Sequence, residues 1–154
     1  MEVPMGSDLT DFMRSALRRV RSTIAKHGYA VQNVLGDECS APFSYTIGLH
    51  RSHGYELVMT GIAPKLAESL LHTMVDRFAD IAGPEPGMKM DRVLGGGYQV
   101  QMRRVDSLRN FSLLRAVFGE DAGPVYWQAL WPDSSGVFPA EPGCSLSPGT
   151  QPFF

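Results

Sequence analysis

The sequence predicts a single α+β domain in which a mostly antiparallel sheet of five or six strands packs with three helices. Three observations favour this class. Three segments repeat apolar residues at helical spacing. The segments between them either alternate apolar and polar residues or are rich in β-branched residues, as strands are. A linker of hairpin length joins two of these strand-like segments. With 154 residues, 44% of them hydrophobic, the chain can bury one core and is too short for two ordinary domains.

The expected elements follow from this periodicity. Helices are predicted over residues 7–26, 63–83 and 107–119, and strands over 29–36, 42–49, 55–62, 90–94, 97–105 and 124–133. The domain would cover residues 7–139, and residues 140–154 would form a Pro/Gly-rich tail that is either docked or disordered. Because three helices can cover one face of a sheet, we expect the other face to be partly free for a groove.

Charge and cysteine content disfavour several classes of protein. The formal net charge of −2, from 16 acidic and 14 basic residues, gives no excess that would attract nucleic acid or an anionic membrane surface. Cys39 and Cys144 form no C-x-x-C pair, which argues against a structural zinc site and a disulfide scaffold. No segment has the pattern of a signal peptide or a membrane span. We expect a soluble cytoplasmic protein. The sequence leaves its oligomeric state open, and a homo-oligomer is possible.

The stretch FSYTIGLHRSHGYELVMTGI, residues 43–62, holds the first candidate site. Glu56 opens an otherwise apolar strand, where a carboxylate must be solvated, paired or hydrogen-bonded. At a pocket mouth it would be partnered by His53 or His27, and could hold a ligand or act as a general base. His27 also has an alternative role as a cap of the first helix. The structural alternative for Glu56 is an ion pair with one of three arginines: Arg51, Arg103 or Arg104.

Two further readings of this stretch concern metal and nucleophile chemistry. His50, His53 and Glu56 are spaced three and three, which would suit zinc on a helix, but a hairpin is expected here, so no metal site is predicted. Tyr45 and Thr46 can supply hydroxyls to a ligand. Neither lies in the strand–turn–helix context of a nucleophile elbow, so a serine-hydrolase site is not indicated.

The second candidate site lies in WQALWPDSSGVFP, residues 127–139. Gln128 and Asp133 flank Trp131 at the end of a predicted strand. A tryptophan there most simply belongs to the core, but two polar groups around an indole are also typical of a small-molecule pocket. We therefore expect Glu56 and Trp131 to face a common hollow, with His53 and Asp133 on its rim.

Several motifs together resemble an uncharacterised bacterial family, the domain of unknown function 4262. These are HGYAVQNV, APFSYTIGL, HGYELVMTGI, YWQALWPDSSGVFP and QPFF, in that order. Family members tend to read HGW, PPFAYTVGL, HPELV and LQxxWPDxxGxFPW, often with QP further on, so the resemblance runs from about His27 to the last residue. Tyr55 replaces the usual proline and Ala140 the usual tryptophan. The pattern falls on the following positions: His27, Gly28, Pro42, Phe43, Tyr45, Thr46, Gly48, Leu49, His53, Glu56, Leu57, Gln128, Trp131, Pro132, Asp133, Gly136, Phe138 and Pro139.

The resemblance implies no established activity, and three functions remain open. The first is a binding or regulatory module for a small molecule or a protein segment, favoured because no complete catalytic set can be assembled from the sequence. The second is a small enzyme, a hydrolase for example, that uses His53 and Glu56 as an acid–base pair. The third is a flavin- or other cofactor-binding sheet domain. The expected ligand-binding residues are His27, Tyr45, Thr46, His53, Glu56, Gln128, Trp131 and Asp133.

Overall fold

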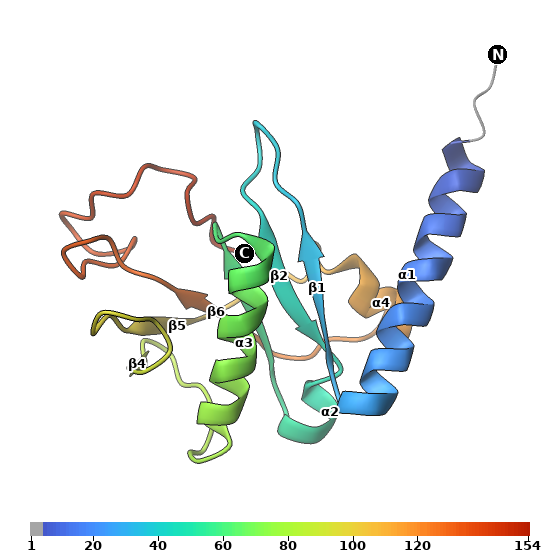
Figure 1. Cartoon of the computed structure of the whole chain (residues 1–154), viewed down its shortest axis with the longest axis horizontal. Helices are drawn as coiled ribbons and strands as arrows, with labels where there is room; N and C mark the ends of the chain where they lie inside the picture. The colour runs from blue at the N-terminus through green and yellow to red at the C-terminus, as the bar shows by residue number, and fades with distance from the viewer. Residues whose placement is uncertain (1–4) are drawn as a thin grey trace.

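The computed structural model describes residues 5–154, with side chains from Thr10 onward, and confirms a single α+β domain (Figure 1). Four helices form, three of them of seven residues or more: α1 (Met5–His27), α2 (His50–His53), α3 (Pro64–Phe78) and α4 (Ser112–Phe118). The strands are β1 (Ala30–Val34), β2 (Phe43–Ile47), β3 (Glu56–Thr60), β4 (Lys89–Met90), β5 (Val100–Arg104) and β6 (Tyr126–Leu130).

The six strands form one sheet in the order β1-β2-β3-β6-β5-β4. All neighbours are antiparallel except β3 and β6, which run in the same direction with Glu56 beside Tyr126 and Val58 beside Gln128. β2 and β3 pair as the predicted hairpin would, with Tyr45 opposite Val58. Their connection differs from the prediction, because residues 50–53 form a helical turn, α2, closed by Gly54 in the left-handed conformation.

Helices cover both faces of the sheet, so the expectation of one partly free face is wrong. On one face, α3 packs Leu71, Met74 and Phe78 against strand residues that include Leu57 and Met59. On the other face, α1 and α4 pack against the opposite side of the same strands; their buried contributions are Ala16, Val20, Leu113 and Leu114. Successive strand residues point to opposite faces, so these continuously apolar strands feed two cores rather than one.

The segment after β6 returns to the sheet without forming a helix or strand. Its end packs into the second core, where the ring of Phe154 meets Phe43 and Phe111 edge-on, with ring centroids 4.9 and 5.9 Å apart. Residues 151–154 therefore pack against the sheet, where Gln128 and Arg103 bond to their backbone.

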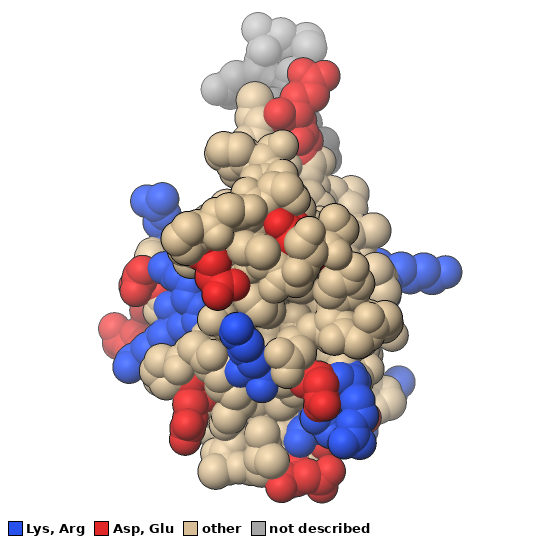
Figure 2. Space-filling view, turned by 90° about the vertical axis from the view of Figure 1, so that its left-hand side faces the viewer, with Lys and Arg blue, Asp and Glu red and all other residues tan. Residues whose placement is uncertain are grey.

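Within the described residues, no helix combines the length and the apolar composition that crossing a bilayer would need. The face seen in Figure 2 carries Lys and Arg interspersed with Asp and Glu around an uncharged area. This distribution agrees with the small net charge and gives that face no field of a single sign.

Candidate functional site

Glu56 lies at the centre of a closed hydrogen-bond network. Its carboxylate is fully buried and accepts bonds from the Thr46 hydroxyl at 2.7 Å, from the backbone N–H groups of Gly48 and Leu49 at 2.9 and 3.2 Å, and from Nδ1 of His50 at 2.5 Å. Thr46 also accepts the N–H of Leu57 at 2.8 Å, so its side chain bridges β2 and β3 where their backbone pairing stops. Four donors therefore use both carboxylate oxygens.

This network explains why the chain turns as it does after β2. The N–H groups of Gly48 and Leu49, which immediately precede α2, both donate to the Glu56 carboxylate, and this fixes the backbone from which the helical turn begins. Tyr126 closes the network from β6 by donating its hydroxyl to the Thr46 carbonyl at 2.5 Å. Burial, followed by the nearby Glu56 carboxylate, raises the pKa of Tyr126 well above its usual value of 10.

The partners predicted for Glu56 are wrong, because the partner is His50. His53, one turn further along α2, is exposed, and its ring nitrogen Nδ1 lies 2.7 Å from Ser52 Oγ. His27 ends α1 and lines a separate hollow with Tyr29 and His72. The acid–base pair of His53 and Glu56 that a small hydrolase would need is not formed.

The three arginines expected to pair with Glu56 are engaged elsewhere or lie away from it. Arg103 binds the Asp106 carboxylate at 2.8 Å, and the Arg51 guanidinium lies over the ring of Phe118. Arg104 is exposed at the end of β5, opposite Trp127. The carboxylate is thus satisfied by His50, a hydroxyl and backbone N–H groups instead of by an arginine.

Tyr45 is a core residue rather than an exposed hydroxyl. It is buried against Phe111 and Tyr126, and its oxygen accepts the N–H of Leu113 at the start of α4. Burial raises the pKa of Tyr45 to about 12. A ligand has no route to this hydroxyl without opening the core.

Gln128 and Trp131 both hold the returning C-terminal segment. The buried Gln128 amide donates to the Pro152 carbonyl at 2.8 Å and accepts the N–H of Phe154 at 3.1 Å. The Gln151 amide in turn accepts the N–H of Trp131 at 2.9 Å and donates to its carbonyl at 2.7 Å. Each glutamine amide therefore bonds to one backbone N–H and one backbone carbonyl, as the backbone of a neighbouring strand would.

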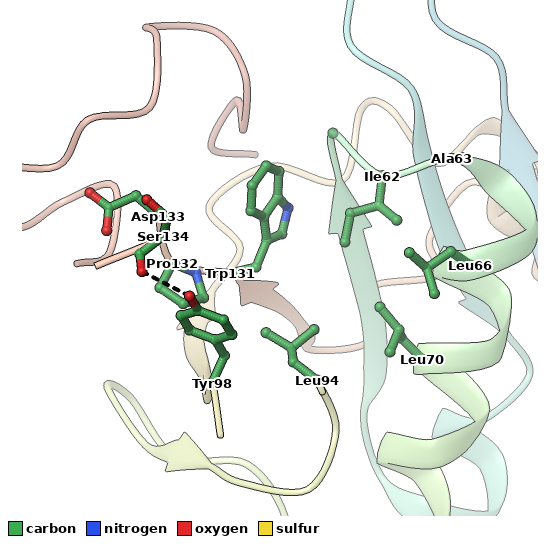
Figure 3. Close-up of a pocket in the computed structure, with 11 residues that line it drawn as sticks. Ile62, Ala63, Leu66, Leu70, Leu94, Tyr98, Trp131, Pro132, Asp133 and Ser134 are labelled. Carbon is green, nitrogen blue, oxygen red and sulfur yellow. Dashed lines mark hydrogen bonds between the residues drawn. The ribbon is translucent and has the colours of Figure 1, made fainter. Parts of the chain in front are cut away.

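Asp133 holds the part of the same segment that precedes residues 151–154. Its carboxylate accepts the backbone N–H groups of Ser145, Val137 and Ser135 at 2.8 to 2.9 Å, and the Ser145 hydroxyl at 3.0 Å. These bonds, those from Ser145 and Val137 foremost, lower the pKa of Asp133 to about 2. The carboxylate points away from the neighbouring hollow (Figure 3).

The expectation that Glu56 and Trp131 face a common hollow is wrong. Glu56 begins β3 beside Tyr126, the first residue of β6, whereas Trp131 follows the last residue of β6. At about 3.3 Å per residue, the two positions are separated by roughly 15 Å along the sheet. The structure keeps Trp131 and Asp133 together and places Glu56 in a different, sealed cluster.

The hollow at Trp131 is a groove between the start of α3, residues 94–98 and residues 131–134 (Figure 3). Its volume is about 570 Å³. Apolar side chains dominate its wall: Ile62, Ala63, Leu66, Leu70, Leu94, Tyr98, Trp131 and Pro132. Leu66 is 55% exposed and Tyr98 37% exposed, so two of the large apolar side chains on this wall are open to solvent. We refer to this hollow as the Trp131 groove.

Sequence reasoning missed three residues of these clusters. Leu66 falls within the predicted helix 63–83, Tyr98 within the predicted strand 97–105, and His50 within a spacing considered only for metal. The GGG run before Tyr98 marks the turn that carries its ring to the groove, where its hydroxyl donates to the Ser134 carbonyl at 2.8 Å. That turn was the available signal for Tyr98. His50 had no signal beyond its nearness to Glu56.

Across the described residues, no group of three or more His, Cys, Asp or Glu side chains is placed to hold a metal ion. Comparison with known proteins gives one finding: a family model described as "Domain of unknown function (DUF4262)" matches residues 23–145. No curated protein and no solved structure matches the chain. The matched range includes the Glu56 network, Trp131 and the Asp133–Ser145 anchor. The chain belongs to the DUF4262 family.

Proposed function

We propose that this protein is a binding module whose Trp131 groove takes the apolar body of a small molecule. The observation that carries the proposal is the cluster of Leu66, Tyr98 and Trp131 in one open hollow of about 570 Å³. Small-molecule sites are usually concave, mostly apolar and of about 300–1,000 Å³. Large apolar side chains gathered in such a hollow are typical of a binding surface.

The groove's polar atoms define the ligand's chemistry. Trp131 already donates its indole N–H to the Thr60 carbonyl at 2.9 Å, and the Asp133 carboxylate is turned away and occupied. The Tyr98 oxygen donates to Ser134 and can still accept one bond. An uncharged ligand with a planar or aliphatic body therefore fits better than a charged one, because burying a charge without a partner is costly.

The position of the groove in the sheet supports the same function. It lies where the two parallel strands β3 and β6 end and their connections leave in different directions, one into α3 and the other into residues 131–134. In open α/β sheets, ligands bind at the carboxyl ends of neighbouring parallel strands where the connections diverge. The present sheet is mixed α+β and not an open α/β sheet, so the lining residues of the groove carry the proposal and the strand ends support it.

A neutral fluorescent probe, N-phenyl-1-naphthylamine, tests the proposal. We expect saturable binding to one site, and an at least tenfold loss of affinity in Leu66→Glu, because its carboxylate would lie beside the apolar ligand. Ile81→Glu is the matched control, since Ile81 is similarly exposed, at 48%, but does not line the groove. Equal binding by both variants, or no saturable binding, would contradict the proposal.

Native mass spectrometry of the freshly purified protein distinguishes the two kinds of occupant. A retained mass of a few hundred daltons that is lost in Leu66→Glu and kept in Ile81→Glu supports a small molecule. If the probe is instead displaced by an apolar peptide and by no small compound, the groove serves a protein segment, and the small-molecule proposal fails.

A further inference from the structure

The docked C-terminal segment occupies a crevice with the features of a peptide-binding site. The crevice lies beside Thr60 of β3, Gln128 of β6 and Arg103 of β5, and is filled by residues 151–154. Two residues at its base, Thr60 and Gln128, are fully buried and polar. Their side-chain bonds go to each other and to the segment: Gln128 donates to Thr60 Oγ1 at 3.1 Å and to the Pro152 carbonyl at 2.8 Å.

Recognition extends over four consecutive residues. Gln151 pairs with both backbone atoms of Trp131, and Gln128 reads the carbonyl of residue 152 and the N–H of residue 154. The Arg103 guanidinium lies 4.7 Å from the ring centre of Phe153, and the Phe154 ring enters the aromatic cluster of the second core. The Gln128 bonds hold the backbone of the segment, while the side chains of Gln151, Phe153 and Phe154 each make a contact of their own, which is more specific than strand pairing alone.

A single exposed turn connects this segment to the rest of the fold. Ser145 is hydrogen-bonded to Asp133, and the contacts with the crevice begin at Gln151. Between them, residues 147–149 are exposed, and the N–H of Thr150 bonds to the Ser147 carbonyl at 3.2 Å to close the turn. A short hinge turn of this kind can open into an extended connection, which delivers the same segment to a neighbouring molecule.

We propose that the crevice is a selective recognition site for the Gln151–Phe154 segment and that it takes this segment from a second copy of the chain when the turn opens. Every contact within the crevice is the same whether the segment arrives from its own chain or from the second copy. The energetic difference is therefore confined to the turn at residues 147–150 and to the concentration of chains. The second copy is the occupant that fits all four positions, because it carries the same sequence.

The first test supplies the segment as a separate peptide. The full chain with Gln151→Ala keeps its crevice but weakens its own segment, and the probe is a labelled peptide of residues 147–154 with its carboxyl end amidated. We expect saturable binding by fluorescence anisotropy, and at least about tenfold weaker binding of a peptide with alanine at the Gln151 position, which lacks two hydrogen bonds. No binding, or equal binding of the two peptides, overturns the recognition site.

The second test asks whether two chains exchange segments. Gln151→Ala has an intact crevice and a defective segment, whereas Gln128→Met or Arg103→Ala has an intact segment and a defective crevice. The Arg103 variant guards against misfolding, because that side chain is partly exposed. A mixture of the two kinds of variant should form a heterodimer in native mass spectrometry, and neither variant should dimerise alone. A mixture that stays monomeric at high micromolar concentration overturns the exchange.

Discussion

The Nδ1 atom of His50 lies 2.5 Å from the buried carboxylate of Glu56, and this pair connects the first turn after β2 to the first residue of β3. A charged group at full burial is stable only where partners replace its water, and four donors do so here. The pair therefore fixes the β2–β3 connection. It lies at the opposite end of the sheet from the Trp131 groove, so stability and binding should be separable by mutation.

Glu56→Gln is expected to lower the free energy of unfolding by about 2–3 kcal/mol. The substitution replaces one carboxylate oxygen, which accepts hydrogen bonds, with an N–H₂ group, which can only donate. Some of the surrounding buried donors would then lose their acceptor. Urea denaturation at pH 7 measures this loss. Glu120→Gln, at an exposed position, serves as control and should stay within about 0.5 kcal/mol of the original chain. If Glu56→Gln were as stable as the control but lost probe binding, Glu56 would belong to a binding site after all.

The two histidines of α2 should differ sharply in their effect on stability. His50→Ala removes one donor from the buried carboxylate, and we expect a loss of about 1–3 kcal/mol. His53→Ala removes an exposed ring that bonds to the neighbouring Ser52 and should change stability by less than about 0.5 kcal/mol. Thermal unfolding of the pair in parallel gives the comparison. Equal effects of the two changes would show that the His50–Glu56 contact contributes nothing measurable.

Asp133 makes the stability depend on acid. Its pKa falls from 3.8 to about 2 on folding, so the unfolded chain binds a proton more readily. The stabilisation is fully present above pH 4 and disappears as the pH falls toward 2. In urea midpoints measured from pH 5 to pH 2, Asp133→Asn should lack this part of the acid dependence. The exposed Asp121→Asn should retain it, and parallel curves for all three proteins would contradict the role of Asp133.

The helices and strands were largely predictable because apolar periodicity is a local property. Helix α3 shows this best: a proline at its first turn marks its observed start at Pro64, although the helix ends at Phe78, five residues before the predicted end. Helix α4 begins five residues later than predicted, at Ser112. The Arg115 side chain binds the carbonyls of Leu108 and Arg109, which fixes the preceding residues outside the helix.

The partners of the site residues were not predictable, because they depend on contacts between distant segments. Sequence alone indicates that Glu56, a carboxylate within an apolar strand, must be satisfied, and it places Gln128 only as a polar group beside Trp131. Their partners come from α2 and from a segment more than twenty positions away, respectively. The helical turn at residues 50–53 is too short to leave a periodic signal, and that turn is what brings His50 to Glu56.

Tyr55 and Tyr126 form a contrasting pair for a hydroxyl deletion. Among the described residues, the buried hydroxyl of Tyr55 has no hydrogen-bond partner, whereas that of Tyr126 donates to Thr46. Tyr55→Phe should therefore leave stability unchanged or raise it by up to about 1 kcal/mol, and Tyr126→Phe should lower it by about 1 kcal/mol. Chemical denaturation of both variants decides the matter. A clear loss in Tyr55→Phe would reveal a partner for its hydroxyl.

Gly61 and Gly143 separate the effect of a close contact from that of backbone strain. Both have positive φ, of 78° and 86°, so an alanine is strained at either position. At Gly61 the added Cβ would also lie 2.2 Å from the Thr150 carbonyl oxygen, whereas at Gly143 no atom lies within 4 Å.

Gly61→Ala should therefore push the docked segment out of its crevice, since that collision involves backbone and cannot be relieved by rotating a side chain. We expect faster hydrogen exchange over residues 150–154 and a loss of stability at least about 1 kcal/mol larger than in Gly143→Ala. Exchange measured by mass spectrometry on both variants gives the result. The added Cβ would also lie 3.2 Å from Cζ2 of the Trp131 indole, and Gly61 itself lines the groove, so the probe affinity of Gly61→Ala should fall while that of Gly143→Ala does not. Unchanged exchange in Gly61→Ala would mean that Thr150 moves aside without releasing the segment.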